Sequence, residues 1–374
     1  MKIVFVVNEL NFFLRTHVNL ANQMGKIHQV SLIADIANSP SDDIESLRKM
    51  GINLYALNRK KNVNKALTYF SYIFSLAKIL KKIKPEYIFY ITLELSFFGS
   101  LISYFIKVKK SIFIITGLGP FFFKKNFRYQ VFNKFQQYSF LLLSIFKKNF
   151  IFIFLNSADK DLLSCKYKIN SLNCQLIYGE GILDSEFRYI ERNETVAKFL
   201  LASRLVKSKG IENFIACAKK IKKQYPHAEF SIAGIYDKTN PESISKELFD
   251  QIKNTDYVNF LGEIPHHQME ECFHMHNVFV LPSEREGLPR AAVEAASTGM
   301  PLILSNVPGC EDCVIEGESG KLIPYMSESE LYKAMEGFID NPSLISLMGK
   351  KSSELAKEKF SLSVIASQYL KVTS

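Results

Sequence analysis

Two short stretches in the second half of the chain combine residue types that could hold and activate a phosphorylated sugar. Arg204 and Lys209 lie five positions apart, and Gly210 follows directly. An apolar run precedes them and a helical pattern follows, which predicts a turn from a strand into a helix. Two cations beside a helix amino terminus suit a diphosphate, because the charges and the backbone amides both stabilise an anion. A basic turn that is merely solvated would look the same.

The second stretch supplies two carboxylates. Glu286 opens the loop 286–290, and Glu294 follows after seven intervening residues. The glycine and proline of this loop favour a tight turn into a helix, so the amides of Gly287 and Leu288 could face a phosphate. Glu286 would then reach a bound sugar, and Glu294 a ribose diol. The alternative is a pair of solvated carboxylates, which the helix dipole favours in any case.

Both stretches lie in the second of two series of strand-like and helix-like segments. Strand-like runs occupy 2–8, 29–35, 53–57, 87–92, 111–116, 151–156 and 174–179, then 197–203, 229–234, 258–262, 278–283 and 301–305. Helical patterns occupy 15–25, 65–83, 210–224, 242–253, 267–275, 287–299 and 361–370. Continuous apolar runs indicate parallel strands that are buried on both faces. The chain of 374 residues is therefore predicted to be α/β, with two doubly wound parallel-sheet domains and ligands at the strand carboxyl ends.

We expect an acceptor-binding domain over 1–185 and a nucleotide-sugar-binding domain over 186–360. A polar linker is predicted near 184–195. The C-terminal segment 361–374 is predicted to be a helix that packs back on the first domain.

Charge divides the chain unevenly. Residues 1–190 carry 26 basic and 12 acidic side chains (+14), and residues 191–374 carry 21 and 25 (−4). Lysines flank apolar positions in segments 65–83 and 124–148, a pattern that suits an anionic membrane surface. Coding sequence rich in A and T, or two core helices with C-terminal lysines, would also explain it. The longest charge-free apolar stretches have 12 or 13 residues, and a membrane span needs about 18–20, so no span is expected.

Three other patterns have simpler explanations than a metal or redox site. Asp159-Lys160-Asp161 follows Asn156 at a predicted helix start, where helix capping is the plainer interpretation. Cys310 and Cys313 form a C-x-x-C without a second pair at zinc spacing, so all six cysteines are expected as free thiols. The pairs His266-His267 and His274-x-His276 do not share a helix face, so a common metal is not expected.

These stretches together resemble the retaining glycosyltransferases of family 4, whose GT-B fold has two Rossmann-like domains facing a central cleft. The resemblance extends to 232–234, 259–264, 278–283, 308–310 with Gly320, and in the first half to 11–14, 116–119, 155–156 with Asp159, and 179–182. The loop Gly287-Leu288-Pro289-Arg290 and the glycines at 117, 119, 179 and 181 resemble the branch that extends lipid-linked oligosaccharides for bacterial surface polysaccharides.

The resemblance implies roles for individual residues. Arg204 and Lys209 would hold the donor diphosphate, Glu286 would contact the donor sugar, and Glu294 the ribose; the first three would be catalytic. The base would be bordered by Gly262, Glu263 and Ile264, and Gly287 and Leu288 would offer backbone amides. The acceptor side would comprise Asn11, Phe13, Arg15, His17, Gly117 and Gly119.

The implied reaction is a metal-independent, retaining transfer without a cofactor. The donor would be a nucleotide sugar such as UDP-GalNAc, UDP-GlcNAc, UDP-Gal or UDP-Glc. The acceptor would be a lipid-linked saccharide of O-antigen (lipopolysaccharide) or capsule biosynthesis, and the protein would be cytoplasmic and peripheral to the inner face of the cell membrane. No nucleic-acid partner is expected. Two alternatives remain open: a non-hydrolysing nucleotide-sugar epimerase on the same fold, and a non-enzymatic protein that binds polyanions or membranes.

Overall fold

The chain divides into two compact units. The structure is a computed structural model that describes residues 1–37, 39–57, 65–118, 122, 127–146, 149–192 and 195–374. Unit 1 consists of Met1–Gly181 together with Ile365–Ser374, and unit 2 of Ile182–Val364. The end of the chain therefore belongs to the same unit as its beginning.

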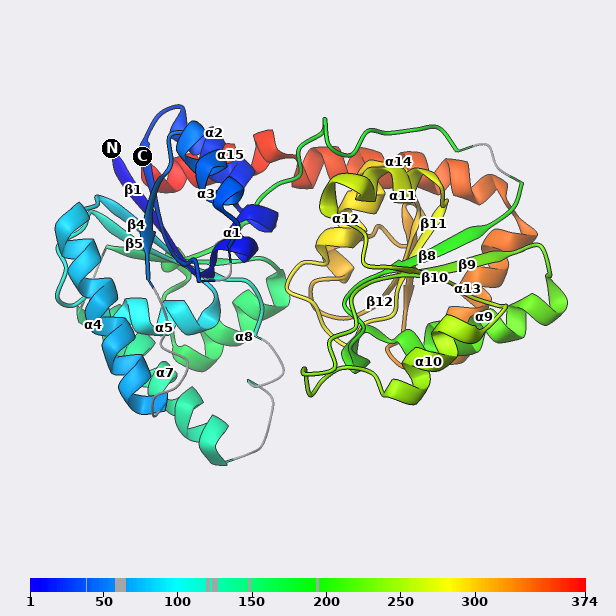
Figure 1. Ribbon diagram of the computed structural model, residues 1–374, viewed down its shortest axis with the longest axis horizontal. Coiled ribbons are helices and arrows are strands. Elements are labelled where there is room, and N and C mark those ends of the chain that lie inside the picture. Colours follow the sequence, from blue (N-terminus) through cyan, green and yellow to red (C-terminus); the bar gives the residue numbers. More distant parts are fainter. Residues whose placement is uncertain (38, 58–64, 119–121, 123–126, 147–148, 193–194) are drawn as a thin grey trace. The chain divides into compact units, whose positions relative to one another are not determined.

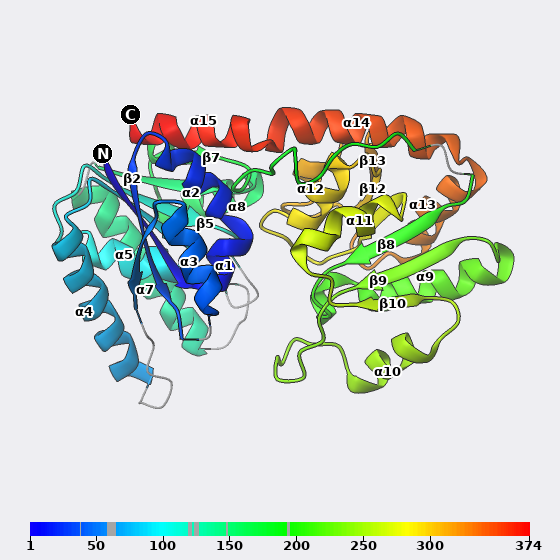
Figure 2. The ribbon, with the colours of Figure 1, turned by 45° about the horizontal axis from the view of Figure 1, so that its top comes forward.

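The described residues of unit 1 form a seven-stranded parallel sheet in the order β3-β2-β1-β4-β5-β6-β7. Its strands are β1 (Lys2–Glu9), β2 (Gln29–Asp35), β3 (Asn53–Ala56), β4 (Tyr87–Ile91), β5 (Lys110–Ile115), β6 (Phe150–Phe154) and β7 (Cys174–Leu176). Its helices are α1 (Leu10–Thr16), α2 (Val18–Gly25), α3 (Ser41–Lys49), α4 (Lys65–Ile83), α5 (Leu93–Ile102), α7 (Phe127–Phe146), α8 (Ser157–Tyr167) and, from Ile365 onward, α15 (Leu362–Thr373). Figures 1 and 2 show α4, α5 and α7 together on one face of this sheet.

Alternate residues of the buried strands pack against opposite helical layers. Val4 and Val6 of β1 belong to a buried cluster that includes residues of α4, α5, α7 and α8. Phe5, between them, stacks on Phe89 of β4 at 4.8 Å and contacts Phe13 of α1 at 5.8 Å. Phe89 also contacts Tyr369 of α15. The strands are covered on both faces, which explains their continuous apolar sequences.

The described residues of unit 2 form a six-stranded parallel sheet in the order β10-β9-β8-β11-β12-β13. Its strands are β8 (Lys198–Ala202), β9 (Glu229–Ala233), β10 (Asn259–Gly262), β11 (Val278–Leu281), β12 (Leu302–Ser305) and β13 (Gly320–Ile323). Its α-helices are α9 (Ile211–Gln224), α10 (Lys246–Asn254), α11 (Met269–His274), α12 (Arg290–Ser297), α13 (Glu328–Asp340) and α14 (Ser343–Phe360). The two doubly wound sheets confirm the predicted fold class.

Strand order reverses at one place in each sheet, between β1 and β4 in unit 1 and between β8 and β11 in unit 2. In doubly wound folds the loops after these two strands diverge to opposite faces and leave a crevice, where ligands bind. In unit 2 those loops carry Lys209 and Glu286.

The predicted helix over 287–299 was wrong at both ends, since α12 spans Arg290–Ser297. Leu288 precedes Pro289, and a residue before proline is disfavoured in helical conformation, so the helix begins after the proline. At the other end Gly299 adopts a left-handed conformation with φ of 89°, which terminates a helix.

Candidate active site

The loops that follow β8 and β11 are fastened to each other. The Glu284 amide donates a hydrogen bond of 2.8 Å to the Ser208 carbonyl. Gly210 has a φ of 68°, and a Cβ added there would lie 2.2 Å from the carbonyl oxygen of Pro282. Only glycine combines this left-handed backbone with such a close approach. The glycine that ends the Arg204–Gly210 stretch therefore sets the distance between the two loops.

The fastening brings Lys209 and Glu286 into contact. Lys209 Nζ lies 2.5 Å from Glu286 Oε1, and the two side chains are only 15% and 11% exposed. The attraction between the charges is stronger in this sheltered place than at the surface, because water screens it less. The sequence predicted that both residues would lie at one edge of the sheet, and the structure brings them within hydrogen-bond distance.

A third loop, the one after β12, contacts the backbone of Glu286. The Glu286 amide donates to the Pro308 carbonyl at 3.1 Å. A Cβ on Gly309 would lie 2.5 Å from the Glu286 carbonyl oxygen and 2.7 Å from that of Gly287. The backbone of the 286–287 segment thus lies against the loop after β12, while the Glu286 side chain contacts Lys209 from the loop after β8.

Glu294 lies on α12 and is almost fully buried, with 3% of its surface exposed. Its Oε1 accepts from Arg290 Nε at 2.6 Å and is 3.0 Å from His266 Nε2. Sequence reasoning missed both partners. Arg290 stands one helical turn before Glu294, a spacing that could have suggested the ion pair, whereas nothing in the sequence links position 266 to position 294.

The other donor-side candidates lie just after β8 and at the end of β10. Arg204 is exposed, while its backbone is fixed by the flanking hydrogen bonds of Ser203 to Ala233 and Leu205 to Ile235, each 3.0 Å long. The Gly262 carbonyl accepts from the Gly234 amide at 2.7 Å, at the end of β10. The next two residues, Glu263 and Ile264, are exposed and half-buried.

The acceptor-side candidates of unit 1 are divided between surface and core. Asn11 and Arg15 are exposed on α1, but Phe13 and His17 are buried and lie 6.4 Å apart as stacked rings. The two buried residues would therefore act by shaping α1. Gly117 has a φ of 135°, and Gly119 lies outside the described residues.

Sequence reasoning also missed Thr92, which follows β4 beside the point where the first sheet reverses. It has a φ of 98°, a strained value for a β-branched residue. Thr92 is the N-cap of α5, and its hydroxyl accepts from the Leu95 amide. Glu94, in the first turn of α5, accepts a hydrogen bond of 3.4 Å from the Asn8 amide group, so the end of β1 and the start of α5 meet.

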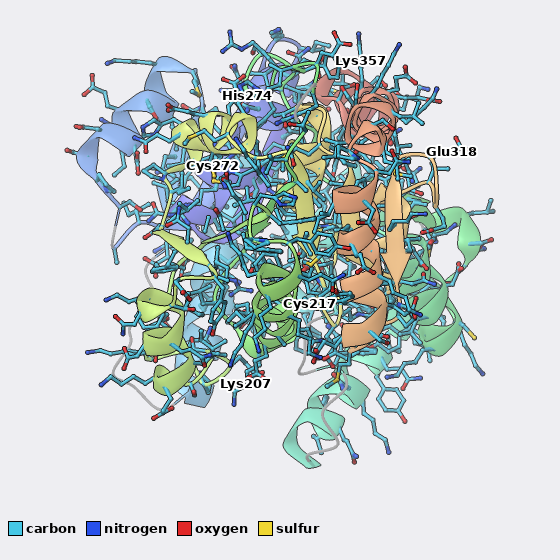
Figure 3. The ribbon with its side chains drawn as sticks, turned by 90° about the vertical axis from the view of Figure 1, so that its right-hand side faces the viewer. Lys207, Cys217, Cys272, His274, Glu318 and Lys357 are labelled. Atoms are coloured by element: carbon cyan, nitrogen blue, oxygen red, sulfur yellow. The ribbon has the colours of Figure 1, made fainter. Side chains whose placement is uncertain are left out.

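Other residue patterns have structural partners. Asn156 caps α8 by accepting from the Asp159 amide at 2.7 Å, as the capping interpretation predicted. All six cysteines are free thiols. Figure 3 shows Cys217 and Cys272 on separate helices, α9 and α11. Burial raises the pKa of Cys217 to about 12 and that of Cys310 further, so neither is a ready nucleophile.

Three of the histidines predicted not to share a metal each contact a different group. His266 meets Glu294, His274 Nε2 lies 2.9 Å from the Arg188 carbonyl oxygen, and His276 Nδ1 lies 2.7 Å from that of Cys272. Within the part of the chain that the structure describes, no three His, Cys, Asp or Glu side chains gather as a metal site would require.

Comparison with known proteins identifies two sequence families. The pattern described as "Glycosyl transferases group 1" matches residues 184–357, and "Glycosyl transferase 4-like" matches residues 2–154. The N,N'-diacetylbacillosaminyl-diphospho-undecaprenol alpha-1,3-N-acetylgalactosaminyltransferase of Campylobacter jejuni is 22% identical over 350 residues, which cover 89% of each chain.

Solved structures show the same fold. Sucrose-phosphate synthase from Thermosynechococcus elongatus has a TM-score of 0.80 at 18% identity and covers 100% of this chain and 98% of its own. Anabaena HepE in complex with UDP and glucose has a TM-score of 0.77 at 15% identity and covers 100% and 99%.

Proposed function

Because the chain belongs to the group 1 glycosyltransferases, with a family 4-like first half and a GT-B fold, we propose that it uses a UDP-sugar donor. It transfers a hexosyl or N-acetylhexosaminyl group, with retention of configuration and without a metal ion, to a lipid-linked saccharide. At family level the chain is a glycosyltransferase of bacterial polysaccharide biosynthesis. The observation that carries the proposal is the contact between Lys209 and Glu286 where the strand order of the second sheet reverses.

The proposed chemistry follows from the leaving group. As the bond between the anomeric carbon and the diphosphate oxygen breaks, negative charge grows on the diphosphate. Arg204 and Lys209 stabilise this charge, and Lys209 is already held at this place by its contact with Glu286. The acceptor hydroxyl oxygen bonds to the anomeric carbon on the same face, and its proton passes to the departing phosphate oxygen. Glu286 orients the sugar, and Glu294 accepts from the ribose hydroxyls.

Support for an acceptor at a membrane comes from the surface of α7. Phe135, Tyr138, Leu142 and Ile145 are 45–64% exposed and lie at helical spacing on one side of the helix. Lys134 is exposed beside them, and Phe74 on α4 is 73% exposed. Segment 65–148 carries 14 basic and 2 acidic residues. Apolar side chains within a basic surface suit binding to the headgroup region of anionic lipids. Among the described helices, none has the length and hydropathy of a membrane span.

Binding of the α7 surface to anionic lipids is tested by sedimentation with vesicles of phosphatidylcholine, with and without phosphatidylglycerol. Replacing Phe135 and Ile145 by Ser should abolish binding to the anionic vesicles. Leu172→Ser is the matched control, because Leu172 is 83% exposed and lies outside the exposed apolar side of α7. Equal binding by the Phe135/Ile145 variant and by Leu172→Ser would contradict membrane docking through α7.

The donor is tested by thermal stabilisation with a panel of UDP-sugars. A ligand at 100 times its dissociation constant should add about 2.7 kcal/mol to the free energy of unfolding. Incubation with the donor alone separates transfer from epimerisation, because an epimerase converts the donor without an acceptor. Activity that survives EDTA supports metal independence, and activity that EDTA abolishes and Mg²⁺ restores contradicts it.

A further inference from the structure

The carboxylate of Glu294 is held by two residues that are not among the donor-binding candidates. Arg290 Nε and His266 Nε2 both meet the same oxygen, Oε1, at 2.6 and 3.0 Å. Oε2 takes part in neither contact. Because a carboxylate only accepts hydrogen bonds, the His266 contact requires that Nε2 carries the hydrogen. The two donors anchor one oxygen of the carboxylate, and neither of them uses Oε2.

His266 is itself fixed on its other side. It lies in the short helix His266–Gln268 that follows β10 and the candidate base-binding residues Gly262–Ile264. The edge of its ring meets Phe187 at 5.6 Å between centroids and at an angle of 76°. Phe187 is buried and packs against Phe273 of α11. The imidazole therefore connects the loop after β10 with the carboxylate on α12.

We propose that His266, together with Arg290, is a positioning residue that turns Glu294 Oε2 toward the hydroxyls of the nucleotide ribose. The inference rests on the proposed function, in which Glu294 accepts from the ribose. His266 extends that role, because it fixes the position of the Glu294 carboxylate relative to the base-binding loop. A nucleotide whose ribose lacks one hydroxyl would therefore lose part of the binding free energy that this carboxylate contributes.

The test compares the binding of UDP and 2′-deoxy-UDP by isothermal titration calorimetry. His266→Phe keeps an aromatic ring against Phe187 but has no donor, whereas His266→Gln keeps an N–H donor near the position of Nε2. His267→Phe is the matched control, since His267 is the next residue on the same short helix and, like His266, is exposed.

We expect His266→Phe to weaken UDP binding about tenfold, because the loss of one hydrogen bond to a charged group changes affinity by about that factor. The ratio of the affinities for UDP and 2′-deoxy-UDP should fall about threefold or more. His266→Gln should recover most of the preference, and His267→Phe should match the wild type. Unchanged UDP binding in His266→Phe, an equal loss for both nucleotides, or a Gln variant that behaves like Phe would each overturn the inference. A wild-type protein that binds neither nucleotide would instead refute the UDP donor, and with it the ribose role.

Discussion

The ion pair between Lys209 and Glu286 can be tested by a double-mutant cycle that separates its structural effect from its catalytic effect. Lys209→Met and Glu286→Gln each remove one charge and keep most of the volume. At 15% and 11% exposure the pair lies between a surface pair and a fully buried one. Surface pairs contribute about 0–1 kcal/mol, and breaking a buried pair costs about 3–5. We therefore expect each single variant to lose about 2 kcal/mol of unfolding free energy.

The double variant should be less destabilised than the sum of the two, by about 3 kcal/mol, because no unpaired charge remains in it. Its transfer activity should nevertheless stay at the level of the single variants, at least about 100-fold below wild type, because the leaving diphosphate still lacks its cation. Stability is measured by urea unfolding and activity by transfer of a radiolabelled sugar.

The pair Lys220–Glu328 is a matched control. It has the same N–O distance of 2.5 Å, but its side chains are 65% and 37% exposed. Lys220→Met and Glu328→Gln should leave both the stability and the activity close to those of the wild type, because water screens an exposed pair. Additive destabilisation by Lys209→Met and Glu286→Gln would refute the ion pair, and a well-folded, fully active double variant would refute its role in transfer.

Two further predictions follow from the packing of unit 2. Gly210→Ala should cost more than about 2 kcal/mol and lower transfer, because the new Cβ strains a positive φ and presses on the Pro282 carbonyl. Gly317→Ala, with a φ of 77° and open space around it, should cost only about 1–2 kcal/mol; equal losses in urea unfolding would contradict the close contact. Burial lowers the pKa of His276 below 6.5, so the folded state resists protonation while the unfolded state accepts it. Stability should therefore fall as the pH drops below about 6.5, by at most about 1.4 kcal/mol per pH unit, and His276→Asn, which retains a donor toward the Cys272 carbonyl, should reduce that slope in urea titrations between pH 7 and pH 5.

The sequence could predict the elements and the edge of the sheet where the candidate residues meet. Apolar runs identified the strands, and the periodic segment that ends before Pro85 corresponds to α4, Lys65–Ile83. The order of strands in a doubly wound sheet brings the loops after β8 and β11 together. Lys209 and Glu286 could therefore be expected at one edge from their positions alone.

The side-chain contacts could not be predicted, because they depend on distances that no spacing encodes. Lys209 reaches Glu286 because the backbone of Gly210 lies against Pro282, a contact across 72 positions. His266 meets Glu294 across 28 positions, and its sequence neighbourhood showed only a histidine pair for which no common metal was expected. Burial of His17 likewise follows from its packing against Phe13 at the end of α1 and not from its residue type.

The arrangement of the charges favours a single extended ligand over separate ions. In a nucleotide sugar, one bond joins the diphosphate to the anomeric carbon, so groups that bind the phosphate and the sugar must be neighbours. Lys209 and Glu286 are neighbours at 2.5 Å. The ribose lies further along the donor, and Glu294 has a separate anchorage with Arg290 and His266. In the structure the Lys209 charge is balanced by Glu286. A diphosphate that takes over Lys209 would release this carboxylate, at the place where the sugar hydroxyls require an acceptor.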